Sequence, residues 1–197
     1  MSVYLYDEAF VNKLQAWTKS TNVKVYGPDD TKRLFEVMAA EGNDAPIQLP
    51  IICLRRKPGV NVLNPNKKPI TYDGFTLEAN LDKSLQLNAI PIDVQYQLDI
   101  YTRHFKEADE FLRNITFNII NYPKLTVQIP CDSLKVEHDG YIRMSNNIDD
   151  NSSIPERLIP GQFTRFTFNV YIDDAYLWNA KVRPNYQIVG AEVEVEN

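Results

Sequence analysis

The sequence predicts an α+β protein in which a mixed or antiparallel β-sheet is flanked by two or three helices. Residues 92–100 alternate apolar and polar side chains as a strand does, and the segment directly after them repeats with the period of a helix. The C-terminal third is mostly β-prone. The chain has 197 residues, of which 44% are hydrophobic, so it can bury one sizeable core. We therefore expect a single domain over residues 1–197.

The N-terminal part predicts a helix, a short strand, a second helix and an apolar strand. Asp7 is a candidate N-cap for a helix of about residues 8–18, because the apolar side chains that follow it share one helical face. Residues 23–26 are β-prone, and Pro28 with two acidic residues suits the first turn of the second helix. After a loop, residues 51–54 form the apolar strand.

Residues 55–87 predict an extended excursion, because turn-forming Pro, Gly and Asn residues divide them into short segments. The segments are too apolar for a free linker, so we expect a β-arm that packs on the body or on a neighbouring chain. A surface loop with its own small cluster is the alternative. The candidate subunit-interface residues of this arm are Val60, Val62, Tyr72 and Phe75.

The centre of the chain predicts a strand, a helix and a second strand. Residues 92–100 form a strand with one buried and one wet face, in which Asp93, Gln95, Gln97 and Asp99 lie on the wet side. A helix of about fifteen residues follows, and Tyr122 and Pro123 end it. The period of two returns at residues 125–129.

The C-terminal third predicts a hairpin over residues 136–144, broken at Asp139 and Gly140, and strands at about residues 166–172 and 189–195. Residues 145–161 are expected to be a long polar loop that orders on assembly. The last strand ends in alternating apolar and acidic residues. It is either an edge strand protected by charge or a strand that adds to another subunit through Val193 and Val195.

Composition narrows the classes of function. The formal charge of -5 predicts no general attraction to nucleic acid or to an anionic membrane. No apolar run approaches the roughly 20 residues that span a bilayer, and the first residues do not form a signal peptide, so we expect a cytoplasmic protein. Cys53 and Cys131 stand beside apolar residues and are interpreted as small buried side chains. With only two histidines, a structural zinc site is not expected.

The sequence predicts no catalytic, cofactor or metal site. It lacks a glycine-rich phosphate loop and a G-x-S-x-G turn. His104 is expected to be a solvated residue at a helix start, and His138 a turn residue. Asp149 and Asp150 offer oxygen atoms to calcium but lack the spacing of an EF-hand loop.

Two alternatives concern acidic and basic residues. Asp173 and Asp174 are expected in a turn after a strand, or, with His138, in the cleft of a soluble enzyme. Two basic clusters are either solvated loop charges or contacts with an acidic neighbour or with a lumen that holds nucleic acid. Their members are Arg55, Arg56, Lys57, Lys67 and Lys68.

Residues 90–102 end in Asp99-Ile100-Tyr101-Thr102, and a helix opening with the acidic run Glu107-Ala108-Asp109-Glu110 follows. This unit resembles the tail terminator and tail-completion (neck) proteins of tailed bacteriophages, whose strand ends in Asp-Ile, an aromatic residue and a hydroxyl residue. Residues 166–173 and 6–19 are also similar to segments of such virion proteins. The resemblance is concentrated in residues 90–129.

The resemblance implies a sheet flanked by helices and assembly into a ring, commonly a hexamer. Such a ring ends polymerisation of the tail tube or sheath and joins the tail to the neck. It further implies residence in the virion after assembly in the host cytoplasm, with tail tube or sheath and neck proteins as partners and DNA passing through the lumen. No catalytic residue or cofactor is carried over. Another neck or baseplate protein, a soluble enzyme and a strand-addition binding module are the alternatives.

Overall fold

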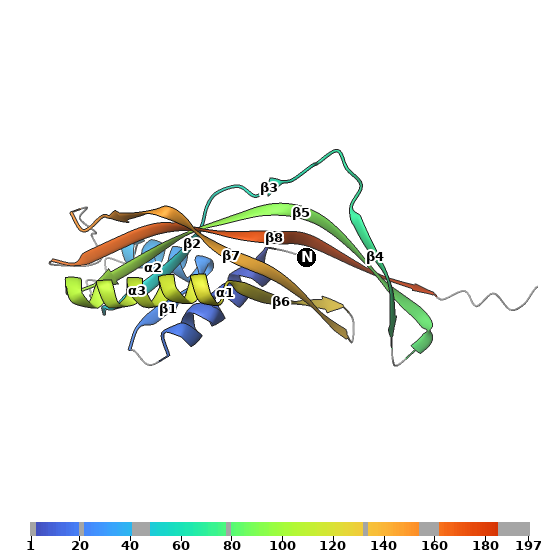
Figure 1. Cartoon of the computed structure of the whole chain (residues 1–197), viewed down its shortest axis with the longest axis horizontal. Coiled ribbons are helices and arrows are strands. Elements are labelled where there is room, and N and C mark those ends of the chain that lie inside the picture. The colour runs from blue at the N-terminus through green and yellow to red at the C-terminus, as the bar shows by residue number, and fades with distance from the viewer. Residues whose placement is uncertain are drawn as a thin grey trace, which may run out of the picture.

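The computed structural model describes residues 3–19, 22–40, 48–77, 80–131, 134–153 and 162–184. It confirms the mixed α+β class: within these residues eight strands form one curled mixed sheet, and three helices accompany it (Figure 1). The main path through the sheet has the order β1-β2-β5-β8-β7-β6, and β3 and β4 also pair with β5. Among the strands of the described residues, β1 and β2 pair in parallel and the other pairings are antiparallel.

The helices are α1 (Tyr4–Trp17), α2 (Pro28–Ala40) and α3 (Phe105–Asn121). The first four strands are β1 (Lys24–Tyr26), β2 (Ile51–Arg56), β3 (Asn61–Val62) and β4 (Ile70–Leu77). The other four are β5 (Asn80–Thr102), β6 (Lys124–Cys131), β7 (Leu134–Asp150) and β8 (Thr164–Pro184).

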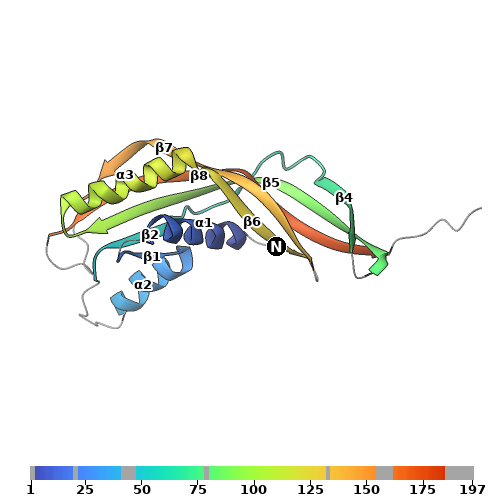
Figure 2. The same ribbon diagram turned by 60° about the horizontal axis from the view of Figure 1, so that its bottom comes forward.

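The main hydrophobic core joins α1 and α3 to the central strands. Phe10 and Leu14 of α1 share a buried cluster with Phe111 and Ile115 of α3. The same cluster includes inward-facing residues of β2, β5 and β8, of which Leu98 is one. Figure 2 shows α1 and α3 along the part of the sheet where these strands run together. The helical period in residues 105–119 therefore predicted α3 correctly, because its apolar stripe faces this core.

The prediction for the start of the first helix was wrong. α1 begins at Tyr4, its N-cap is Val3, and Asp7 lies one turn inside the helix with its side chain buried. The Asp7 carboxylate accepts hydrogen bonds from residues of β2 and β5, and these tertiary contacts replace the predicted capping role.

Two strands are much longer than their alternating patterns predicted. β5 and β8 pair almost continuously from Lys83 opposite Pro184 to Thr102 opposite Thr164. The register shifts once, where Asp173 and Asp174 lie between the partners of Ile92 and Val94. Asp174 has φ 58°, a left-handed conformation that Asp tolerates, so the two aspartates lie in a bulge inside β8 and not in a turn after it.

Residues 55–87 comprise the end of β2, the strands β3 and β4, and the first part of β5. β3 pairs with β5 at Ile92 and Asp93, and β4 pairs with the first part of β5, between Asn80 and Ala89. In Figure 1 β4 and the adjoining parts of β5 and β8 extend well past the helices.

The hairpin predicted at Asp139 and Gly140 was also wrong, because β7 continues through both residues. The hairpin lies between β6 and β7 instead, from Lys124 opposite Tyr141 to Cys131 opposite Leu134. A Cβ atom on Gly140 would lie 3.1 Å from the main-chain oxygen of Asp173, so this glycine permits a close approach of β7 to β8.

The predicted polar loop at 145–161 is only partly a loop. Residues 145–150 belong to β7, and residues 148–150 pair with β8, for example Ile148 with Phe168. Residues 154–161 lie outside the described part of the chain, as do Val193 and Val195. The side chains of Phe75 and Cys131 also lie outside it.

Candidate functional site

A buried carboxylate connects α1 to two strands. The Tyr96 hydroxyl donates a hydrogen bond of 2.7 Å to Oδ1 of Asp7, and the Arg56 guanidinium donates one of 3.0 Å to Oδ2. Burial raises the pKa of Asp7, while the hydrogen bond from Tyr96 and the charge of Arg56 act in the opposite direction. The arrangement connects three elements and faces the interior.

A second buried carboxylate lies on β5. Asp99 is 0% exposed and accepts hydrogen bonds from Thr167 Oγ1 at 2.6 Å and from Arg165 at 3.1 and 3.2 Å. Arg55 Nε lies 3.5 Å from its other oxygen. The expectation of a wet face for this strand is thus wrong at Asp99, because cationic side chains from β2 and β8 cover the carboxylate.

The basic residues predicted to face a lumen or an acidic partner fall into two groups. Arg55 and Arg56 are consecutive residues of β2 whose side chains point to opposite faces of the sheet. Each forms an ion pair with an acidic residue of this chain, Asp99 and Asp7 respectively. Lys67 and Lys68 are exposed between β3 and β4, and Lys57 is half-buried after β2. The structure thus separates the two arginines, which stabilise the interior, from lysines available to a partner.

The predicted interface residues also lie in different environments, some packed on the core and others exposed. Val60 packs against the main core. Val62 and Tyr72 are exposed, together with Leu63 and Ile70, which lie between them. These four side chains keep between 41% and 46% of their area accessible, so they form a short apolar stretch of the described chain on or between β3 and β4.

The residues of the alternative enzyme site do not bring their functional groups together. His138 Nε2 lies 2.7 Å from the main-chain oxygen of Asp174, not from a carboxylate. Asp173 forms an ion pair with Arg143 at 3.0 Å. His138 lies within β7 opposite Val127, so the turn predicted for it was wrong; its ring contacts aromatic residues of β8.

Other candidate groups are placed as follows. His104 is the exposed N-cap of α3, as expected for a helix-start residue. Cys53 is buried as predicted, and burial raises the pKa of its thiol to about 12. Asp149 and Asp150 end β7, and Asp150 accepts a hydrogen bond from the Ser152 main chain at 3.0 Å. Within the described ranges, no three His, Cys, Asp or Glu side chains are grouped so that they could hold a metal ion.

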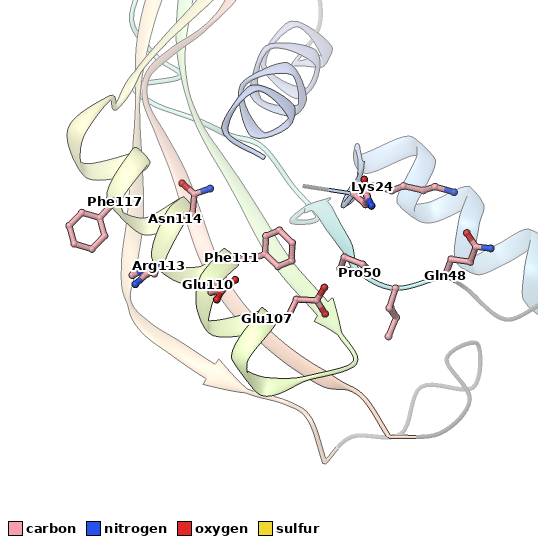
Figure 3. A pocket seen from close by; sticks show the side chains of 11 residues that line it. Lys24, Gln48, Pro50, Glu107, Glu110, Phe111, Arg113, Asn114 and Phe117 are labelled. Atoms are coloured by element: carbon pink, nitrogen blue, oxygen red, sulfur yellow. The ribbon is translucent and has the colours of Figure 1, made fainter. Parts of the chain in front are cut away.

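A pocket of about 950 Å³ lies between α3 and the start of β2. Its α3 wall includes Glu107, Glu110, Phe111 and Phe117, and Figure 3 shows Glu107 and Phe111 directed toward Pro50. Arg113 and Phe117 lie on the outer side in that view. The opposite wall is formed by Asn22, Lys24, Gln48, Leu49 and Pro50. Sequence reasoning missed this pocket, because its walls come from segments far apart in the chain.

No helix in the described part of the chain is long and apolar enough to cross a membrane. No family model matches this chain, and no curated protein matches it.

Proposed function

We propose that this chain is a structural virion protein that forms a ring at the head-proximal end of a bacteriophage tail. The ring ends polymerisation of the tail tube or sheath and joins the tail to the neck. Support comes from the strand-and-helix unit at residues 90–129, which resembles tail terminator and neck proteins. In this proposal α1 and α3 flank the sheet of the body, and β3, β4 and the adjoining part of β5 form the arm.

The observation that carries the proposal is the apolar stretch of Val62, Leu63, Ile70 and Tyr72. A single exposed apolar side chain is ordinary on a protein surface, but several within one short segment indicate a contact surface. The same segment pairs with β5 beyond the helix-covered body, where a neighbouring subunit can reach it. Burial of these side chains against a neighbouring subunit stabilises the assembly through the hydrophobic effect.

A closed ring is the simplest assembly for such a contact. When a patch on one copy of the chain binds a different patch on the next copy, repetition of this contact generates a ring if the rotation between copies closes. The resemblance implies six copies around a lumen through which DNA passes. The ring contacts the tail tube or sheath on one side and neck proteins on the other, and membranes have no part in it.

The proposal assigns no catalytic residue and no cofactor. Its function consists of contacts, and the residues that provide them are the exposed arm side chains and the lysines beside them. A protein at another position in the neck or baseplate uses the same kind of contact. The location of the chain within the particle therefore distinguishes a tail terminator from another neck or baseplate protein.

The test is the position of the protein in assembled particles. Antibodies raised against the purified chain and labelled with gold are applied to particles from cells that encode it. Label at the junction of head and tail supports the proposal. Label at the distal tip, or particles that lack the protein, would overturn it.

Loss of the protein gives a second readout. Cells in which the reading frame is deleted are expected to produce tails of uncontrolled length that lack heads. A matched strain that carries the same deletion and expresses the chain from a plasmid should restore tails of uniform length. Uniform, head-attached tails in the deletion strain would contradict the proposed role.

A further inference from the structure

We infer that the C-terminal segment of one copy, residues 185–197, adds as a strand to the free edge of β4 in the next copy. This inference rests on the proposed function, because it requires self-assembly. It deepens that function by naming the segment that covers the exposed apolar side chains of the arm. Residues 185–197 lie outside the described part of the chain, so the argument uses their sequence and the described surface of the arm.

β4 has an unpaired edge. It pairs with β5 on one side, and no strand of the described residues pairs with it on the other. Figure 1 shows β4 at the outside of the arm, away from the three helices. The unpaired edge of a strand presents main-chain N–H and C=O groups that another extended segment can bind. The edge of β4 therefore suits a partner that forms a strand.

The arm has one apolar and one polar face. Tyr72 of β4 lies opposite Leu87 of β5, and its ring centroid lies 6.0 Å from that of Trp178 on β8. Leu87 and Trp178 belong to one buried apolar cluster on this face. The other face carries neutral polar side chains and one lysine, and no acidic residue is among the described residues that line it. Its polar members are Thr71, Gln86, Asn88, Asn179 and Lys181.

The C-terminal segment has the same two-sided character. Residues 191–196 alternate apolar and acidic side chains, and successive side chains of a strand point to opposite faces. A strand added to β4 can place Val193 and Val195 beside Ile70 and Tyr72, with its glutamates on the polar face. A shift by one residue would reverse both faces, so burial of the valines restricts the register of the added strand.

Charge favours the same partner. Residues 61–72 are all exposed, and they contain Lys67 and Lys68 but no acidic residue; Asp73 follows them. Within the described residues neither lysine forms an ion pair. Residues 185–197 contain three acidic residues and no basic one, and these are Glu192, Glu194 and Glu196. The two segments are therefore complementary in charge, which favours their association.

The position of the chain end indicates a contact between copies. β8 runs toward the tip of the arm and ends at Pro184, opposite Lys83. β4 and β8 lie on opposite sides of β5, so the C-terminal segment reaches β4 of its own copy only by reversing direction around the tip. β4 of a neighbouring copy requires no such reversal. The segment has 13 residues and β4 has 8, so the segment can cover the strand after a short connector.

The first test is charge reversal with compensation, read as mass in solution by light scattering over a range of protein concentrations. The wild-type chain is expected to form a ring-sized assembly as concentration rises. Lys67→Glu with Lys68→Glu, or Glu192→Lys with Glu194→Lys, should each raise the concentration needed for assembly at least about tenfold. The chain with all four substitutions should return to within about threefold of wild type, because the charges match again.

The control is Lys19→Glu with Lys106→Glu, which makes the same change in net charge as the lysine variant at exposed positions outside the arm. It should assemble as the wild type does. Rings that form equally well in the two one-sided variants would overturn this contact and leave the ring itself standing. A wild-type chain that stays monomeric at every concentration would overturn the ring and the contact together.

A cysteine pair distinguishes a contact between copies from one within a copy. The full chain carries Ile70→Cys and Val193→Cys, and Cys131→Ser removes a native thiol, while Cys53 is buried. After oxidation, a denaturing gel without reductant should show a ladder of linked chains, because each copy is joined to the next. Linkage confined to single chains, or no linkage, would overturn the contact.

The matched control replaces Ile70→Cys by Thr126→Cys, at an exposed position of β6, in the same chain. It should remain unlinked, because β6 does not receive the C-terminal segment. A ladder of equal intensity in this control would show that the thiols meet by chance collision and would contradict the proposed contact.

Discussion

The hydroxyl of Tyr96 donates a hydrogen bond of 2.7 Å to the buried carboxylate of Asp7, and this contact fastens the N-terminal helix to the middle of β5. Arg56 of β2 binds the other oxygen of the same carboxylate. One aspartate therefore joins three elements that lie far apart in the sequence. Polar groups in such an interior site help to specify one arrangement of helix and sheet only when each of them is satisfied.

Replacing Tyr96 by Phe should lower the free energy of unfolding by about 1 to 2 kcal/mol, because the buried carboxylate loses one donor. Replacing Asp7 by Ala should cost about 2 to 3 kcal/mol, because both donors then lack their acceptor. Urea denaturation measures both changes. Asn12→Ala, at an exposed position of α1, should change stability by less than about 0.5 kcal/mol. Equal effects at Asn12 and Asp7 would contradict the role of the buried contact.

The raised pKa of Asp7 predicts a pH dependence. Burial raises the pKa of this carboxyl above the ordinary value of 3.8, so the folded state holds the proton more tightly than the unfolded state. The resulting stabilisation is complete below the unfolded pKa and is lost as pH rises through the folded pKa. The stability of wild type minus that of Asp7→Asn should therefore fall as pH rises above about 4. A difference that grows over this range would show that the carboxyl pKa is lowered.

Asp99 should matter far more than an aspartate at the surface. Asp99→Ala leaves Arg165, whose side chain is 11% exposed, without its buried partner, and should cost about 3 to 5 kcal/mol. Asp173→Ala removes the partner of the exposed Arg143 and should cost at most about 1 kcal/mol. Thermal or urea unfolding compares the two identical substitutions. Similar losses of unfolding free energy in the two variants would mean that the burial of Asp99 and its partners contributes little to the stability of the protein.

The thiol of Cys53 should be unreactive in the folded protein. Burial raises its pKa to about 12, so almost no thiolate is present at pH 8 and reagents cannot reach the sulfur. The measurement uses a Cys131→Ser chain, in which Cys53 is the one remaining thiol, and an aromatic disulfide reagent. We expect no reaction without denaturant and one thiol in denaturant. Rapid reaction of the folded chain would show that β2 opens readily.

Local pattern alone identified several elements correctly. The helical stripe after residue 104 corresponds to α3, and the alternation at residues 92–100 lies within β5. The apolar run at residues 51–54 lies within β2. The two periodic segments were predicted correctly because the side chains that define each period face one core. Residues 51–54 are buried on both faces of the sheet, so a continuous apolar run identifies them.

Strand length and the break at Gly140 could not be read from such windows. β5 and β8 continue past their alternating segments because each supplies the other's hydrogen bonds and a bulge at Asp173 and Asp174 absorbs the change of register. Gly140 looked like a turn, yet it lies within β7, where the lack of a side chain lets β8 approach. In both cases the deciding contact is with a strand distant in the sequence.

The sequence by itself determined the mixed class, the apolar faces and the supply of charged residues for partners. Only the tertiary structure decided which of those charges remain available. Arg55 and Arg56 bind Asp99 and Asp7 inside the chain, whereas Lys67 has no ion-pair partner among the described residues. The physical reason is that the environment of a charged group depends on residues folded against it, and no short stretch of sequence contains those residues.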